Sequence, residues 1–178
     1  MSEGAKNTLL PKWIDPRKLA QMRAVYEGSV TPEKLPRLRA AVEFLDVLQA
    51  RVEFGIDDNG KRCIKGELEA TLSLICQRCM EPISIRVKAE PLLAVVASEE
   101  KAEELSKDYD PWIVPEVEAD LHAMVEDEML LALPIVAYHR EPCVDSSLLA
   151  SKDTENVPDE SDNPFSVLAV LKGKAGKD

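Results

Sequence analysis

Apolar and polar residues alternate along the middle of the chain with the period of a β-strand. Even-numbered positions from 42 to 54 are apolar except Asp46, and the same alternation runs through residues 64–74 and 83–89. Such alternation is typical of strands with one buried face. Between the first two stretches, Asp57-Asp58-Asn59-Gly60 is a strong turn signal, because Asn-Gly readily takes the positive φ angles of a tight turn. The pattern therefore predicts a long hairpin followed by a third strand.

The third strand has a predicted continuation, and one short strand follows later. Pro91 is typical of an edge or a bulge, and Leu93 and Val95 continue the alternation after it. Residues 98–110 are acidic and predict a loop, and residues 112–114 add a short strand.

Helix signals flank the strands. Asp15-Pro16 and Thr31-Pro32 are typical helix starts, and Pro36 keeps the second helix short, so the region before the sheet is expected to form brief helical turns. The stretch 119–134 shows helical spacing of apolar residues between a capping Asp120 and Pro134, which ends it. Residues 165, 168 and 171 predict a short amphipathic helix near the end of the chain.

Together these elements predict an α+β fold: an antiparallel β-sheet built on a long hairpin, with a packed helix and short N- and C-terminal helices. The chain of 178 residues suits one core. We divide it into a basic helical N-terminal arm packed on the domain (1–40), an α+β core (41–144), an acidic disordered linker (145–162), and a short C-terminal helix with a basic tail (163–178). No secretory signal or apolar membrane span is visible, so we expect a cytoplasmic protein without a membrane partner.

Charge is unevenly distributed along the chain. A net charge of −11 argues against general nucleic-acid binding, because phosphate contacts depend on Lys and Arg. The N-terminal arm is nevertheless basic. The candidate RNA contacts are Arg17, Lys18, Arg23, Arg37 and Arg39, with Arg78 in the cysteine turn as a further one. The acidic span 99–162 suits binding of a basic protein, and both charged regions are also compatible with ordinary solvated surfaces.

Two cysteines three positions apart, Cys76 and Cys79, end the second strand of the hairpin. Such a turn supplies two thiolates to zinc, and His139 and Cys143 are the economical second pair for a structural site. A redox couple is disfavoured, because redox cysteines of this spacing sit at the start of a helix. A tight turn with the thiols packed beside it remains an alternative. A disulfide framework is not expected in a reducing compartment.

No catalytic motif is visible, so we expect no enzymatic activity. His122 and Glu126 are four residues apart in the predicted main helix, beside Asp127 and Glu128. Because no companion motif accompanies them, the sequence predicts a solvated helical face, with Glu128 near the apolar stripe and facing a specific partner.

Four segments together resemble one family. They are DPRKLAQMRAVYEG, the Cys-Gln-Arg-Cys turn after the long hairpin, DLHAMVEDEMLLALPIV and NPFSVLAVLK, in this order over nearly the whole chain. The combination resembles the bacterial YceD family. The resemblance implies a role in the synthesis, processing or stability of 23S ribosomal RNA, and hence in large-subunit assembly in the cytoplasm. It implies no catalytic mechanism.

Two functional hypotheses follow. The first is a non-enzymatic assembly factor that binds large-subunit ribosomal RNA, a precursor ribosomal particle or a ribosomal protein. The second is an acidic binding module, or chaperone, for a basic ribosomal protein. Charge reversal in the N-terminal arm separates them, because it abolishes RNA association under the first and leaves protein binding intact under the second.

Overall fold

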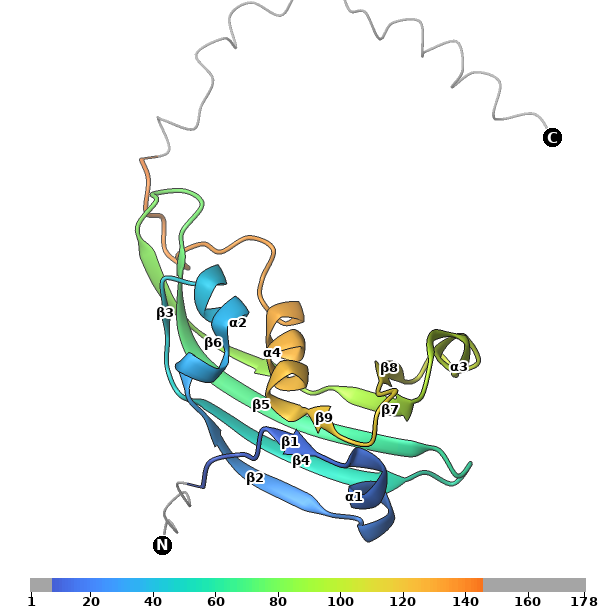
Figure 1. The fold of residues 1–178 in the computed structure, drawn as a ribbon. Coiled ribbons are helices and arrows are strands. Elements are labelled where there is room, and N and C mark those ends of the chain that lie inside the picture. The colour runs from blue at the N-terminus through green and yellow to red at the C-terminus, as the bar shows by residue number, and fades with distance from the viewer. Residues whose placement is uncertain (1–7, 146–178) are drawn as a thin grey trace, which may run out of the picture. The chain divides into compact units, whose positions relative to one another are not determined.

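The computed structural model describes residues 8–145 (Figure 1). Met1–Arg140 forms one compact unit, and the fold below is that of this unit. The predicted C-terminal helix and nearly all of the predicted linker lie outside the described residues.

The fold is α+β, as predicted, and its centre is a mostly antiparallel sheet. The path of the sheet runs β2-β4-β5-β7-β8, and β3 and β6 also pair with β5. Only the pairing of β7 with β8 is parallel among the paired strands of this sheet in residues 8–145. The strands are β2 (Val25–Val30), β3 (Phe44–Leu45), β4 (Leu48–Ile56), β5 (Arg62–Ile75), β6 (Pro82–Ala89), β7 (Leu92–Val96) and β8 (Asp110–Ile113). A separate short ladder joins β1 (Trp13–Ile14) to β9 (Ala119–Asp120).

The predicted long hairpin is confirmed as β4 and β5, whose register runs from Gln49↔Glu69 to Ile56↔Arg62. Asp57 organises its turn, because its carboxylate accepts hydrogen bonds from the backbone N–H groups of Asn59 (2.9 Å) and Lys61 (2.7 Å). Gly60 takes a φ of 78°, whereas Asn59 keeps a negative φ. The third strand and its continuation are confirmed as β6 and β7, with Pro91 between them.

The first predicted strand is interrupted between β3 and β4. The partners shift by one residue between Leu45↔Leu72 and Gln49↔Glu69, which is the signature of a β-bulge at Asp46 and Val47. The assignment of Phe44 to the buried face is therefore wrong: Phe44 is 59% exposed, and Leu45 is buried in its place. The extra residue reverses which side chains of this segment face the core.

The described helices are α1 (Pro16–Met22), the 3₁₀ turn η1 (Pro32–Lys34), α2 (Pro36–Ala41), α3 (Glu99–Glu103) and α4 (Leu121–Leu131). The predicted capping residues Asp15 and Asp120 accept hydrogen bonds from the first turns of α1 and α4. Two predictions need correction. Residues 25–30 are a strand and not a helical turn, because β4 offers them a full ladder of partners. The predicted acidic loop contains α3.

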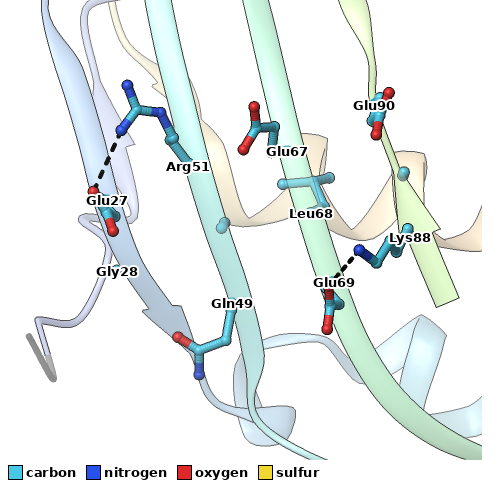
Figure 2. A pocket seen from close by; sticks show the side chains of 11 residues that line it. Glu27, Gly28, Gln49, Arg51, Glu67, Leu68, Glu69, Lys88 and Glu90 are labelled. Carbon is cyan, nitrogen blue, oxygen red and sulfur yellow. Dashed lines mark ion pairs between the residues drawn. The ribbon is translucent and has the colours of Figure 1, made fainter. Parts of the chain in front are cut away.

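The core lies between the sheet and the helices α1, α2 and α4, with α1 packed on β4 and β5 and α4 on β6 (Figure 1). Ile64 and Leu72 of β5 are fully buried, as are Leu38 of α2 and Leu121 and Met129 of α4. The opposite face is polar. That face carries a hollow of about 340 Å³. Figure 2 shows its lining side chains, among which Arg51 pairs with Glu27 and Lys88 pairs with Glu69. The sheet therefore has one buried and one solvated side, as its alternation predicts.

Candidate metal centre

The cysteine turn is a compact loop between β5 and β6, called the knuckle here (residues 75–82). The Cys76 backbone N–H donates to the Glu81 carbonyl (2.9 Å), and the Met80 N–H donates to the Cys76 carbonyl (3.0 Å). Met80 takes a left-handed φ of 62°, which lets the chain turn back into β6. Cys76 is fully buried and Cys79 is partly buried, so both thiols point into the protein side of the loop.

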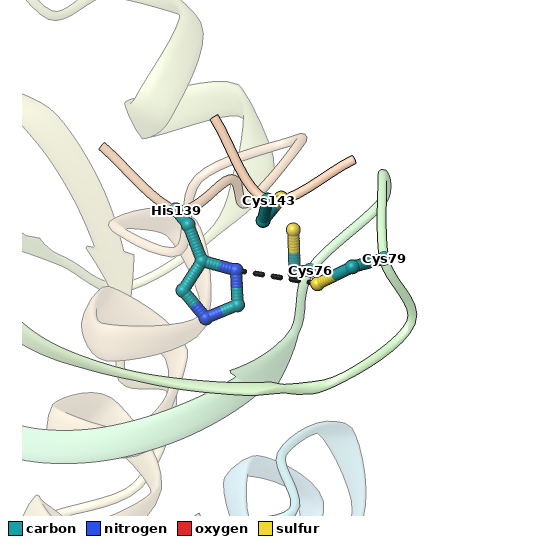
Figure 3. Close-up of side chains that lie close together, drawn as sticks. All are labelled: Cys76, Cys79, His139 and Cys143. Atoms are coloured by element: carbon teal, nitrogen blue, oxygen red, sulfur yellow. Dashed lines mark hydrogen bonds between the residues drawn. The ribbon is translucent and has the colours of Figure 1, made fainter. Parts of the chain in front are cut away.

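A segment after α4 lies against the knuckle, and we call residues 132–140 the strap. The Gln77 backbone N–H donates to the carbonyl of Ala137 in the strap (2.9 Å). This bond brings His139 beside the knuckle, where its Nδ1 lies 3.3 Å from Cys79 Sγ (Figure 3). The Gln77–Ala137 hydrogen bond and the Cys79–His139 contact thus join two segments that are sixty residues apart in the sequence.

The four predicted ligands come together. The ligand atoms of Cys76, Cys79, His139 and Cys143 all lie within 4.8 Å of one another (Figure 3). In a tetrahedral zinc site, metal–sulfur bonds of about 2.3 Å and metal–nitrogen bonds of about 2.0 Å place neighbouring ligand atoms about 3.5–3.8 Å apart. The cluster therefore has the donor set and nearly the spacing that a metal ion of this kind requires.

The backbone of the knuckle favours a thiolate at Cys76. Burial raises the pKa of this thiol, but the backbone N–H groups of Cys79, Arg78 and His139 donate to its sulfur and outweigh burial. Together with the Cys79 side chain they lower the pKa to about 5. A thiolate is the form that binds metals. The cysteine pair lies between two antiparallel strands and not at a helix start, as the sequence indicates.

The predicted RNA contacts fall into two groups in the structure. Arg17 donates to the backbone carbonyls of Val114 and Glu116, and Arg37 binds the carboxylates of Glu126 and Asp127, so both hold the fold together. The other four side chains are exposed, and no ion pair with a carboxylate engages them within residues 8–145: Lys18, Arg23, Arg39 and Arg78. Arg78 instead lies over the ring of Tyr138 in the strap, 4.7 Å from its centroid.

The prediction of a solvated face at His122 and Glu126 is wrong. Glu126 is 3% exposed and caps α2 from a neighbouring helix: its Oε1 accepts the backbone N–H groups of Arg37 (2.7 Å) and Leu38 (3.1 Å). His122 is also buried, and its Nε2–H donates to the Leu10 carbonyl (2.9 Å). Leu35, at the N-cap position of α2, has no side-chain oxygen to accept these N–H groups, so the packing of α4 against α2 supplies the carboxylate.

Asp127 and Glu128, the two acidic residues that follow Glu126, are less buried than Glu126. Asp127 is exposed and pairs with Arg37 (2.6 Å). Glu128 is partly buried, and burial together with the nearby carboxylates of Asp110 and Asp127 raises its pKa. Among the described residues no cation pairs with Glu128, and a specific partner for it stays a prediction.

The fold and the cluster define a small α+β protein whose Cys-x-x-Cys knuckle and strap form a candidate metal centre. The family model described as Large ribosomal RNA subunit accumulation protein YceD matches residues 64–172. A Haemophilus influenzae protein of the same name is 36% identical over 171 residues, covering 93% of this chain and 97% of its own. The chain belongs to the YceD family. No solved structure matches it, and no helix in the described part is long and apolar enough to cross a membrane.

Proposed function

We propose that this chain is a non-enzymatic factor in the synthesis, processing or stability of 23S ribosomal RNA, and so in assembly of the large ribosomal subunit in the bacterial cytoplasm. The observation that carries the proposal is the near full-length similarity to a relative named for accumulation of that RNA. Binding of precursor ribosomal RNA or of a ribosomal protein is the way in which a protein without catalytic machinery acts in such a process.

For RNA contact, the supporting surface is the group of arginine and lysine side chains that the fold leaves available. Lys18, Arg23 and Arg39 are exposed, and Arg78 stands at the tip of the knuckle. Arg17 and Arg37 contribute charge, but their donors are engaged within the protein. Each phosphate contact steepens the salt dependence of binding, so these side chains make a testable set.

The test is ultraviolet crosslinking in growing cells, followed by sequencing of the recovered RNA. We expect crosslinks concentrated on large-subunit precursor RNA. Reversing the charges of Lys18, Arg23 and Arg39 to glutamate is expected to abolish them, whereas the same reversal at exposed Arg62, Lys65 and Lys107 is not. Crosslinks that survive the first reversal contradict the assignment of these contacts.

The second candidate is an acidic binding module for a basic ribosomal protein. The net charge of −11 favours it, because a strongly acidic chain attracts basic proteins and repels bulk RNA. Absence of RNA crosslinks together with a co-purifying basic ribosomal protein would favour this candidate over the first.

For the cluster, we propose a structural zinc ion held by Cys76, Cys79, His139 and Cys143. Three thiolates and one imidazole suit zinc, and four protein ligands leave no open position for a substrate. Bound there, the ion supplies a crosslink between the knuckle and the residues after α4. The role is architectural, because the ion would add metal–ligand bonds to the contacts by which the strap already lies against the knuckle.

Elemental analysis of the purified full chain tests this site. We expect about one zinc per chain, lost in Cys76→Ser, with a lower melting temperature after treatment with a chelator. Cys63→Ser is the matched control, since Cys63 lies in β5 and outside the cluster. Equal zinc content in Cys76→Ser and Cys63→Ser, or no metal in the parent chain, would overturn the proposal.

A further inference from the structure

The strap carries an apolar surface that the fold does not use. From Leu131 to His139 the sequence has no charged residue, in a chain that is 31% charged. Ile135 is completely exposed, at 102%, and Leu131 at the end of α4 is 80% exposed. Val136 and Tyr138 are also exposed. Uncharged, aromatic and large aliphatic side chains gathered on an exposed surface are typical of protein-binding sites.

The surface is held in place, unlike an ordinary loop. Gln77 of the knuckle fixes the strap by its bond to Ala137, and Arg78 is stacked on Tyr138. A side chain that is already ordered loses little entropy when a partner binds, which increases affinity. Arg and Tyr are also the side chains most often found at the energetic centre of protein interfaces.

Beside Ile135 there is a hollow of about 230 Å³ between the strap, the end of β5 and the link from α2 to β3. Val42, Leu74 and Pro134 line it with Ile135, and Glu43 is the only charged residue among its lining residues. No cation pairs with Glu43 within the described chain. A hollow lined by several apolar side chains, with one available carboxylate at its edge, suits an apolar side chain that is followed by a lysine or an arginine.

The negative charge of the chain favours one class of partner for this surface over the others. RNA is disfavoured in the hollow itself, because none of its lining residues is aromatic and able to stack a base, and Glu43 repels phosphate. A second copy is disfavoured, because each copy carries a net charge of −11. A basic polypeptide gains from both the apolar contact and the charge.

We propose that the strap, Leu131 and the hollow at Glu43 form a docking site for a basic protein of the large ribosomal subunit. The site takes an apolar side chain of that protein into the hollow and a neighbouring cation against Glu43. This inference rests on the proposed role in large-subunit assembly and identifies the class of partner.

The test places a photo-crosslinking benzoylphenylalanine at position 135 of the full chain in growing bacteria, with the same residue at position 117 as the control. Val117 is also exposed, at 66%, and does not line the hollow. We expect position 135 to crosslink to one basic large-subunit protein, identified by mass spectrometry, and position 117 not to do so. The identified protein is then purified from salt-washed large subunits for titration.

In that titration, Ile135→Asp is expected to weaken binding roughly tenfold or more, because it removes a central apolar contact. Glu43→Lys is expected to weaken binding and to reduce its salt dependence. Val117→Asp is expected to bind as the parent does. A crosslink from position 135 to RNA or to a second copy overturns the proposal, as does the absence of any crosslink or equal binding by Ile135→Asp and Val117→Asp.

Complementation separates this inference from the proposed function. In a strain that lacks the protein, we expect the parent and Val117→Asp to restore 23S ribosomal RNA and Ile135→Asp not to restore it. If Ile135→Asp restores it fully, the docking site is wrong and the proposed function stands. If the strain never lacks 23S ribosomal RNA, the proposed function itself is wrong, whatever the titration shows.

Discussion

Removing the Glu126 carboxylate is expected to be the most destabilising single change on α4 that leaves the apolar core intact. Glu126 is 3% exposed and accepts three hydrogen bonds, two from the backbone N–H groups that begin α2 and one from Arg37 Nε (2.9 Å). In Glu126→Ala the N–H groups of Arg37 and Leu38 at the start of α2 lose their acceptor, and the buried position of Leu38 leaves water little access to replace it there.

The size of the effect follows from the exposure of the partners. Truncating one member of a fully buried charge pair costs about 3–5 kcal/mol. Arg37 is 53% exposed, so its guanidinium can turn to water and much of that penalty is avoided. The two backbone groups remain, and a lost cap or charged hydrogen bond costs about 1–2 kcal/mol for each. We therefore expect Glu126→Ala to lower the free energy of unfolding by about 3 kcal/mol. That is a large part of the roughly 5–15 kcal/mol of a typical domain.

Two further variants separate capping from charge. Glu126→Gln keeps Oε1 as an acceptor for both N–H groups and loses the charged contact with Arg37, so it should cost about 1 kcal/mol. Asp127→Asn breaks the other ion pair of Arg37. Because Asp127 is 54% exposed, this variant should cost less than about 1 kcal/mol.

Urea unfolding, followed by the fluorescence of Trp13 and Trp112, measures all three differences. The m-value should stay constant, since none of the changes alters the surface exposed on unfolding much. If Glu126→Ala costs no more than Asp127→Asn, Glu126 does not cap α2 in the way argued above, and the reasoning is refuted.

Two further predictions concern backbone strain and buried charge. Met80→Gly should stabilise the protein by about 0.5–1 kcal/mol, because Met80 holds a φ of 62° that only glycine adopts without strain. Met22→Gly is the control in urea unfolding, because Met22 is equally exposed but lies in a helix. This variant should be less stable than the parent by about 1 kcal/mol. Stabilisation of both variants would contradict the strain argument. Glu128→Gln should raise the melting temperature at pH 7, by about 0.5 kcal/mol in stability. Folding raises the pKa of Glu128, so the native state loses stability as the pH rises through the unfolded pKa of about 4.3 and the carboxyl ionises. The gain should therefore vanish in melting curves recorded below about pH 4, and a gain that is independent of pH would point to another cause.

The strands and the main helix could be predicted from sequence periodicity, because an element that buries one face has apolar residues at the repeat of that strand or helix. Residues 64–74 and 83–89 alternate and form β5 and β6, and the apolar spacing before Pro134 forms α4. The hairpin turn could also be predicted from local sequence, since Gly60 alone supplies the positive φ that closes it. Asp15 and Asp120 could be identified as caps because an N-cap acts on N–H groups two or three residues away.

Local patterns could not reveal partners that are distant in the sequence. Residues 25–30 lack a clear alternation and become a strand because β4 lies beside them, and Phe44 faces solvent because one bulge residue shifts the register. Glu126 looked like a surface acid, and only the packing of α4 on α2 buries it and makes it a cap.

For the candidate metal centre, the sequence determined the residue types and the three-residue spacing of the knuckle, which a short turn can realise alone. Whether His139 reaches Cys79 depends on where the chain returns after sixty residues. The tertiary structure decided it, because the sheet sets the end of β5, α4 sets the start of the strap, and the bond from Gln77 to Ala137 joins them. Ligand identity is a property of the sequence, whereas ligand distance is a property of the packed core.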